Sequence, residues 1–354
     1  MVGAGGEIAA HAQLDAPGGI PDLEGLHAFV AGAGEVAACG HRVVQGGPEL
    51  RESVRVDDAI LARLEDLAEL APLHNHAAVE ALREVRRARP ELPAVACFDT
   101  GFHAAMPEAA ARYAIPEEWV TRFGMRRLGF HGLSHAWASR RAAELLERPV
   151  AGLRVVSCHL GAGASLAAVV DGRSVDTTMG FTPLDGLVMA TRSGSIDPGA
   201  MLWLVMHGGL GPDEVEDALM SRSGLAGLSG GSGDMRELLA AAEAGDARAV
   251  LAIDVYVHRL CGQIAAMCAA LGGLDALVFT GGVGEHASGV RARACARLGF
   301  LGVALDDARN AAPGEEDVDL SAPGASVRVL RVAAREELEI ARETRRVCGF
   351  GAEP

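Results

Sequence analysis

Two glycine-rich segments contain the residue types that bind phosphate groups. "HLGAGAS" (159–165) follows the apolar stretch "LRVVSC", and "TGGVGEH" (280–286) follows "LDALVF". Glycines let main-chain amides approach phosphate oxygens because no Cβ stands in the way. One such segment alone is more typical of a tight turn with a positive φ angle. Two of them in one predicted domain favour a nucleotide held by loops at strand ends.

A carboxylate and two arginines have surroundings suited to phosphoryl chemistry. Asp99 ends the apolar stretch "PAVACFD", where it either caps the next turn or holds a divalent cation or aligns a nucleophile. Arg42 in "GHRVVQGG" and Arg192 in "MATRSGS" lie among small residues. Each is either an ordinary surface arginine or a guanidinium that is free to bind a carboxylate or a phosphate.

Histidine and glutamate pairs are the other candidates for chemistry. His131 and His135 lie in "GFHGLSH", where a glycine separates the first histidine from the helix that follows. That spacing favours a hydrogen-bonding His131 and a structural His135 over a metal pair. Glu336 and Glu337 begin the last predicted helix; they either complement the helix dipole or contact a magnesium ion.

The composition excludes several classes of function. All 32 basic residues are arginine, so a Walker A loop, a Schiff-base enzyme and a protein-kinase core, each of which needs a lysine, are excluded. A formal charge of −15 disfavours nucleic acid and anionic membranes as partners. The seven cysteines form no C-x-x-C pair, and no segment has the pattern of a membrane span or a targeting signal. We therefore expect reduced thiols in a cytoplasmic protein.

The predicted elements place these residues at strand ends in two domains. A length of 354 residues is typical of two domains. Apolar strands alternate with amphipathic helices in the first half, and a strand meander with a "DG" hairpin signal begins the second, so we predict a partly parallel α/β protein with a boundary near Pro149. The predicted strands are 35–47, 93–100, 153–160, 164–170, 173–179 and 274–280, and the predicted helices include 22–32, 74–92, 133–149, 246–271 and 335–349. Ser134 is the expected N-cap of the helix 133–149, and Asp234 and Glu237 have the spacing of a capping box at the start of another helix.

These motifs, in this order, resemble the acetate kinase family of the sugar kinase, Hsc70 and actin superfamily. The match runs from about residue 35 to 346 and is carried by "GHRVVQGG", "APLHN", "FDTGFHAAMP", "RRLGFHGLSH", "HLGAGASL", "DTTMGFTPLDGLVMATRSGSIDP", "SGGSGDMRE", "FTGGVGEH" and "EELEIARET". The resemblance implies a two-domain, actin-like ATPase (ribonuclease H-like) fold with mixed sheets. The first domain would comprise 1–148 and 335–354, and the second, which binds nucleotide and forms the dimer, 149–334.

The resemblance also implies a reaction and a set of site residues. A cytoplasmic homodimer would transfer the γ-phosphoryl group of ATP to acetate, reversibly and in line, giving acetyl phosphate and ADP, with Mg²⁺ or alternatively Mn²⁺. The catalytic residues would be Arg42, Asp99, His131 and Arg192, of which His131 and Arg192 stabilise the transition state. Glu336, with Glu337 as the alternative, would hold the metal. The substrate would contact Arg42, Val44, Leu73, Phe130 and Pro183, and ATP would contact His159, Leu160, Gly161, Ala162, Gly163, Asp234, Met235, Arg236, Gly281, Gly282, Val283, Gly284 and Glu285.

The sequence departs from the family pattern at several places. The family's first phosphate loop, N-x-G-S-S-S-x-K, has no counterpart, which predicts an N-terminally truncated first domain and leads to the hypothesis of a sequence that starts late. Ala162 replaces the usual Asn, Gln45 the usual His and Ser195 a common Asp. The alternatives to an acetate kinase are a kinase for propionate or another short-chain acid, and a catalytically inactive nucleotide-binding homologue.

Overall fold

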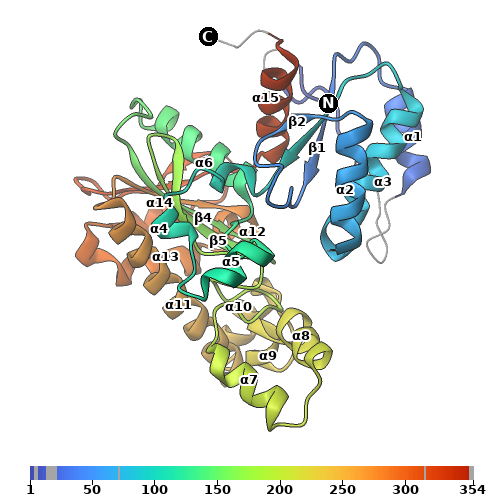
Figure 1. Ribbon diagram of the computed structural model, residues 1–354. Helices are drawn as coiled ribbons and strands as arrows, with labels where there is room; N and C mark the ends of the chain where they lie inside the picture. Colours follow the sequence, from blue (N-terminus) through green and yellow to red (C-terminus); the bar gives the residue numbers. More distant parts are fainter. Residues whose placement is uncertain (4–6, 13–21, 71, 315, 351–354) are drawn as a thin grey trace. The chain divides into compact units, whose positions relative to one another are not determined.

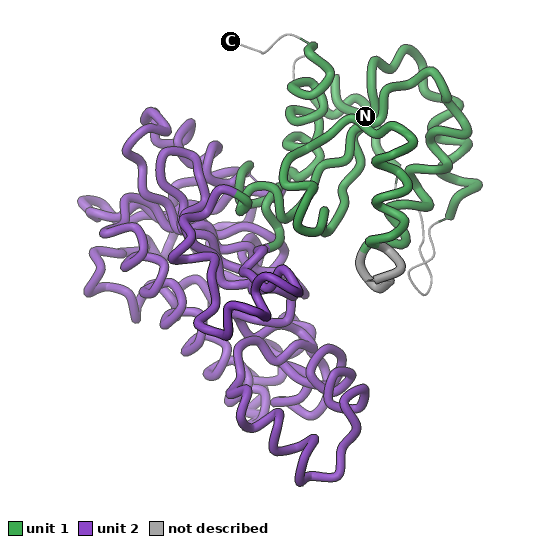
Figure 2. Tube along the Cα trace, viewed as in Figure 1, with its two compact units in different colours: residues 1–104, 130–137, 335–354 green, residues 105–129, 138–334 purple. Residues whose placement is uncertain are grey.

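The computed structural model describes residues 1–3, 7–12, 22–70, 72–314 and 316–350, with the backbone alone for residues 68–70 and 72–74 (Figure 1). The chain divides into two compact units (Figure 2). Unit 1 comprises 1–104, 130–137 and 335–354, and unit 2 comprises 105–129 and 138–334. Unit 1 includes the C-terminal segment 335–354, and unit 2 includes 105–129. The domain boundary near Pro149 stays a prediction.

Unit 1 contains a three-stranded mixed sheet in the order β1-β3-β2. β1 (Cys39–Val43) runs parallel to β3 (Ala94–Phe98), and β2 (Val54–Arg55) runs antiparallel to β3. Every residue of β3 is buried, as expected of a central strand that is covered on both faces. The helices of this unit are α1 (Leu23–Ala31), α2 (Asp58–Leu70), α3 (Pro72–Ala88) and α15 (Glu336–Cys348), with a 3₁₀ turn at Gly101–His103.

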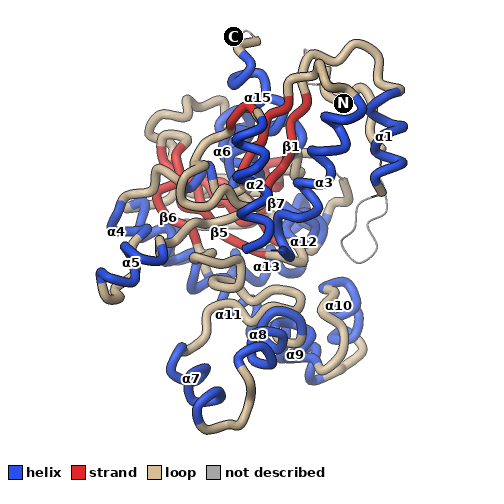
Figure 3. The backbone as a smooth tube through the Cα atoms, turned by 45° about the vertical axis from the view of Figure 1, so that its right-hand side comes forward, coloured by secondary structure: helices blue, strands red, loops and turns tan. Residues whose placement is uncertain are grey.

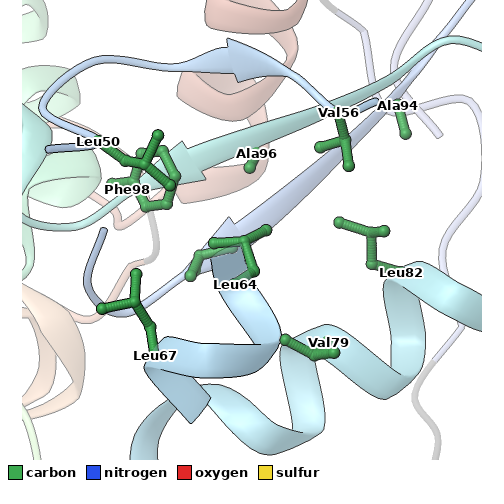
Figure 4. Close-up of a cluster of buried hydrophobic side chains, with 10 residues drawn as sticks. Leu50, Val56, Leu64, Leu67, Val79, Leu82, Ala94, Ala96 and Phe98 are labelled. Atoms are coloured by element: carbon green, nitrogen blue, oxygen red, sulfur yellow. The ribbon is translucent and has the colours of Figure 1, made fainter. Parts of the chain in front are cut away.

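Alternation along β3 divides the core of unit 1 into two layers. Ala94, Ala96 and Phe98 face one side, where they pack with leucines and valines of α2 and α3 (Figure 4). Val95 and Cys97 face the other side and pack against α15. Side chains therefore pack on both faces of β3. This packing fixes the position of the strand and of the residue that follows its carboxyl end.

Unit 2 is built on a six-stranded mixed sheet, whose strands are drawn in red in Figure 3. The strand order is β6-β5-β4-β7-β9-β8. β4, β7 and β9 are parallel neighbours, and the remaining pairs are antiparallel. The predicted "DG" hairpin is confirmed, since Asp171 (φ 54°) and Gly172 (φ 71°) are both left-handed and join β5 to β6. The strands are β4 (Arg154–Leu160), β5 (Ala164–Val170), β6 (Arg173–Thr177), β7 (Ala276–Thr280), β8 (Val318–Asp319) and β9 (Arg328–Arg331).

The long helix α11 (Ala247–Leu271) packs against β4, β5 and β6. It is long and apolar enough to cross a membrane, yet the residues along its inner face, including Ile253, Leu260 and Ile264, are buried in unit 2, as in a core helix. All seven cysteines are free, and five of them are buried. The other helices are α4 (Glu108–Ala111), α5 (Glu117–Phe123), α6 (Gly132–Leu145), α7 (Pro198–Met206), α8 (Pro212–Ser221), α9 (Gly224–Ser229), α10 (Met235–Glu243), α12 (Gly281–His286), α13 (Ser288–Arg297) and α14 (Asp307–Ala311), with a 3₁₀ turn at Gly299–Leu301.

Candidate active site

The parallel register of β1 and β3 brings Arg42 and Asp99 together in unit 1. Arg42 lies beside Cys97, and the Asp99 amide, one residue beyond β3, donates to the Val43 carbonyl at 3.0 Å. The guanidinium binds both carboxylate oxygens, with Nε 3.0 Å from Oδ1 and Nη2 2.6 Å from Oδ2. Two residues that are 57 positions apart thus form a bidentate ion pair because both strands end at one edge of the sheet.

Burial sets the electrostatics of this pair. The Asp99 side chain is 1% exposed, whereas that of Arg42 is 41% exposed. Burial raises the pKa of Asp99 above its usual value, and the Arg42 charge opposes that rise. Burial likewise acts to lower the pKa of Arg42, but the charge and hydrogen bonds of Asp99 raise it above the ordinary value. Arg42 is therefore a fixed cation with one exposed side.

Glu336 and His131 also lie at this pair. Glu336 begins α15, and its Oε2 is 3.4 Å from Arg42 Nε, whereas Glu337 is exposed. Burial raises the pKa of Glu336, which the Arg42 charge opposes and Asp99 reinforces. The main-chain amide of His131 hydrogen-bonds to the Asp99 carboxylate. Unit 1 thus brings together the four unit 1 residues that the resemblance assigns to chemistry: Arg42, Asp99, His131 and Glu336.

The backbone of His131 is itself in the left-handed region, and the glycine after it contacts Asp99. His131 has φ 56°, and Gly132 after it donates to the Asp99 carbonyl at 2.9 Å. A Cβ on Gly132 would lie 2.1 Å from that carbonyl oxygen, so only glycine fits there. The helix predicted to begin with Ser134 as its N-cap begins earlier, at Gly132, because this contact starts the first turn; that N-cap prediction is wrong.

The expected apolar substrate residues of unit 1 are partly placed. Phe130 is buried, and Val44 is half-buried directly after β1. Leu73 falls outside the residues whose side chains are described. One supporting residue was missed by the sequence reasoning: Asn75 is fully buried, and its side chain both donates to the Gln45 carbonyl at 2.9 Å and accepts from the Gln45 amide at 3.3 Å. Asn75 is the last residue of the family motif "APLHN", and this position could have indicated its importance.

The two glycine-rich loops meet in unit 2. β4 and β7 are parallel neighbours with His159 beside Thr280, so the segments 161–163 and 281–285 leave the same edge of the sheet. Gly281 (φ 75°) packs against the β4 backbone, where a Cβ would lie 2.9 Å from the Leu160 carbonyl oxygen. The expected position of both segments at strand ends is confirmed, but the second segment is the short helix α12 and not a loop.

Other glycines in these loops are not required by the backbone. Gly161, Gly163 and Gly282 have no positive φ angle. A Cβ on Gly161 would make only ordinary contacts, and one on Gly282 would meet nothing within 4 Å. The tight-turn explanation therefore holds for Gly281 but not for Gly161 or Gly282. Gly282 is exposed, so its missing side chain leaves the main chain there open to a ligand, whereas Gly161 is half-buried and its amide already donates to the Gly163 carbonyl at 2.9 Å.

The rest of the expected nucleotide residues differ in what their side chains do. Asp234 caps α10 by accepting from the Arg236 amide at 2.8 Å, as the sequence predicts, and the Arg236 side chain lowers the Asp234 pKa to about 2. Met235 is buried, and Glu285 Oε1 accepts from the Ala334 amide at 3.0 Å.

A second supporting residue that the sequence analysis missed is Arg291. Its side chain is 1% exposed and donates to the carbonyls of Gly284 and Glu285. Leu160 is buried, and His159, Ala162 and Val283 lie at or near the same sheet edge.

Arg192 lies on a loop that is tied to the first glycine loop. The Ala190 amide donates to the Ala162 carbonyl at 3.0 Å. Arg192 is half-buried, burial lowers its pKa, and its guanidinium contacts only the Pro183 carbonyl at 3.4 Å and the Met189 sulfur at 3.9 Å. Within the described ranges it has no carboxylate partner. A partly desolvated guanidinium without a counter-ion is a site for an anion.

Comparisons with known proteins give one family. The Acetokinase family model matches residues 22–342. The acetate kinase of Gloeobacter violaceus is 49% identical over 317 residues, which is 89% of this chain and 77% of that protein. The crystal structure of Porphyromonas gingivalis acetate kinase (TM-score 0.84, 38% identity) covers 89% of this chain and 79% of its own, and that of a propionate kinase from Francisella tularensis (TM-score 0.82, 41% identity) covers 88% and 79%. These matches confirm the expected actin-like ATPase fold with mixed sheets.

Proposed function

Because the chain belongs to the acetokinase family, we propose that it is an ATP-dependent acetate kinase, with acetyl phosphate and ADP as products. The observation that carries the proposal is Arg192, a half-buried guanidinium without a carboxylate partner in the described part of the chain, on a loop bonded to a glycine-rich turn. The free cysteines agree with a cytoplasmic enzyme.

Unit 2 supplies the groups for nucleotide and transferring phosphate. Main-chain amides of the segments 161–163 and 281–285 that make no other hydrogen bond would bind the phosphates of ATP; the Gly161 amide is not one of them, because it donates to the Gly163 carbonyl. Arg192 would bind the oxygens of the transferring γ-phosphoryl group or the acid. An acetate oxygen forms a bond to the γ-phosphorus as the bond to the β–γ bridging oxygen breaks, and ADP leaves with that electron pair. Charge on the three equatorial oxygens is stabilised best by cations that are already in place.

Unit 1 supplies the groups for the acid. Asp99 holds Arg42 through two hydrogen bonds, so that the exposed side of the guanidinium stays available to a carboxylate or phosphoryl oxygen. The imidazole of His131, whose backbone is fixed by Asp99, would donate to the transferring group. Of the residues that the resemblance assigns to the substrate, Val44 and Phe130 of unit 1 would contact the methyl group of acetate.

A divalent cation would be held by Glu336 together with substrate phosphates and not by a cluster of protein ligands. Among the residues whose placement is described, no group of three His, Cys, Asp or Glu side chains could hold a metal by itself. Mg²⁺ used with nucleotides typically binds one or two carboxylates, substrate phosphates and water. Glu336, 24% exposed beside Arg42, is such a carboxylate. When bound, Mg²⁺ or Mn²⁺ would neutralise phosphate charge.

Glu336→Gln is expected to raise the Mg²⁺ concentration for half-maximal activity about 10- to 100-fold, because the ligand loses its negative charge. Titration of the initial rate with MgCl₂ at saturating ATP measures the change. The matched control is the exposed neighbour: Glu337→Gln should stay within about twofold of the wild-type value. A shift in the Glu337 variant with none in the Glu336 variant would reverse the assignment.

We also propose that the enzyme is a homodimer that associates through α7 of unit 2. α7 has no buried residue, and Leu202, Trp203 and Met206 are 62%, 58% and 69% exposed. An apolar helix that is exposed along its length is typical of a covered interface. We take the partner that covers α7 to be a second copy of this chain, because that partner is always present with the protein.

Trp203→Glu is expected to raise the dimer dissociation constant about 30-fold or more, because a charge would replace a large interface side chain. Light scattering coupled to gel filtration over a concentration series measures the mass. Phe300→Glu, at an aromatic residue of unit 2 that is 77% exposed outside α7, is the control and should remain dimeric. A wild-type monomer, or equal behaviour of the two variants, would refute the α7 interface.

The acid specificity is tested by comparing acetate with propionate. A pocket that excludes one methylene discriminates by about 1 to 3 kcal/mol, so we expect kcat/KM for acetate to exceed that for propionate about tenfold or more. The similarity to a propionate kinase makes propionate the second candidate. A higher kcat/KM for propionate would change the substrate but not the reaction.

The activity itself is tested by measuring ADP release from ATP with and without acetate. The proposal predicts acetate-dependent release that requires Mg²⁺. ATP binding, measured by calorimetry, without acetate-dependent release would identify an inactive nucleotide-binding homologue instead.

A further inference from the structure

The segment 180–195 carries both Pro183 and Arg192, and its base is closed by main-chain hydrogen bonds. The Ser195 amide donates to the Gly186 carbonyl at 3.0 Å, and at the tip the Met189 amide donates to the Arg192 carbonyl at 3.1 Å. The Arg192 guanidinium itself has only the weak contacts already described. Its direction is therefore set by the loop and not by a partner of its own.

The Asp185 carboxylate holds the base of this loop. Oδ1 accepts from the Ser195 hydroxyl at 2.5 Å and from the Gly186 amide at 2.9 Å. The Ser195 hydroxyl oxygen in turn accepts from the Gly186 amide at 3.0 Å. Asp185 Oδ1, the Ser195 hydroxyl and the Gly186 amide are thus all hydrogen-bonded to one another, which joins the two ends of the loop.

The second oxygen of Asp185 connects the loop, through Arg127, to the main chain that follows β6. Oδ2 is 3.3 Å from Arg127 Nη1, and the same nitrogen donates to the carbonyls of Thr178 and Met179 just after β6. Gly180 leaves room for this arrangement, since a Cβ there would lie 2.8 Å from Asp185 Oδ2 and 2.5 Å from the Tyr113 hydroxyl. That hydroxyl also accepts from the Phe181 amide at 2.7 Å.

We propose that Asp185 and Ser195 are positioning residues for Arg192, and the proposal rests on the acetate kinase function inferred above. Asp185 fixes the base of the loop from two directions, and the loop is the main support that Arg192 has. Neither side chain needs to touch acetate or ATP. Their removal should therefore impair binding of the anion at Arg192 while leaving the glycine loops in place.

The test compares hydroxyl-deleting and hydroxyl-retaining variants. Ser195→Ala is expected to raise KM for acetate about tenfold, from loss of a hydrogen bond to a charged group, with KM for ATP within about twofold. Ser195→Thr, which keeps the hydroxyl, should return KM for acetate to near the wild-type value. Asp185→Asn keeps an Oδ1 acceptor and should lie between wild type and Asp185→Ala.

Two controls separate positioning from general stability. Ser321 is a matched serine of the same unit, since its hydroxyl oxygen accepts from the Val329 amide at 2.7 Å as that of Ser195 accepts from Gly186. Ser321→Ala should not raise KM for acetate. Hydrogen exchange of the peptide that contains 186–195 is the second readout; it should be faster in Ser195→Ala than in wild type and unchanged in Ser321→Ala.

The outcomes distinguish this inference from the proposed function. Acetyl phosphate formation by wild type with unchanged KM and unchanged exchange in Ser195→Ala would overturn the inference alone. A wild-type chain that forms no acetyl phosphate would overturn the proposed function, whereas faster exchange of 186–195 in Ser195→Ala would still support the anchoring of the loop by Asp185 and Ser195.

Discussion

Replacing Asp99 with alanine is expected to lower kcat/KM for acetate about 10²- to 10³-fold, because Arg42 loses the two hydrogen bonds that hold it in place, and the loss of one stabiliser of developing charge usually costs about that much in rate. The loss arises through Arg42. Without Asp99, Glu336 is the remaining carboxylate within 4 Å of that guanidinium in the described ranges. Arg42 would move toward Glu336, and both groups would leave the positions that the reaction needs.

The measurement is a steady-state titration of acetate at saturating Mg-ATP, together with thermal melting of each variant. Asp99→Asn retains an acceptor in the same volume and should lose less activity than Asp99→Ala. Asp275→Ala is the matched control, because Asp275 also binds an arginine, Arg154, through both oxygens, at 3.1 Å each. That variant should lose stability without a comparable loss of kcat/KM. Activity within about tenfold of wild type in Asp99→Ala would contradict the role assigned to the pair.

Replacing Arg192 with alanine is expected to lower kcat for acetyl phosphate formation about 10²- to 10³-fold, the usual cost of removing one stabiliser of developing charge. The fold should tolerate the change, since in the described part of the chain the guanidinium makes only two weak contacts. Arg192→Lys keeps a positive charge but not the planar fork, so it should recover only part of the activity.

Arg222→Ala is the control for Arg192. Arg222 is 59% exposed and pairs with Asp217 at 2.8 Å, so it is an ordinary surface arginine of the same unit. Its variant should remain within about twofold of wild type. Equal rates for Arg192→Ala and Arg222→Ala would remove Arg192 from the catalytic groups and with it the observation on which the proposed function rests most.

Local sequence patterns predicted the residues that end strands and turns. "PAVACFD" indicated a buried strand that ends in Asp99, and apolar stretches before the two glycine-rich segments indicated loops at strand ends; both are confirmed in β3, β4 and β7. These features depend on residues that are neighbours in sequence. The same holds for the "DG" hairpin and for the Asp234 cap, whose hydrogen bonds span only a few residues.

Long-range polar contacts could not be predicted from local patterns. Asn75 binds the backbone of Gln45 across 30 residues, and Arg127 binds Asp185 across 58. Neither pair has a spacing that a helix or a strand would impose. The family resemblance assigned roles to residues expected to contact substrates but none to Asn75, Asp185 or Arg291, whose hydrogen bonds go to other residues of the protein.

The central claim is that this chain transfers phosphoryl groups to a carboxylate and that Arg192 is required. The most direct measurement is trapping of the product with hydroxylamine after incubation of wild type and Arg192→Ala with acetate and Mg-ATP. We predict acetyl hydroxamate from wild type and a rate about 10² to 10³ times lower from the variant. No acetyl hydroxamate from a wild-type chain that binds ATP, or equal amounts from both proteins, would contradict the claim.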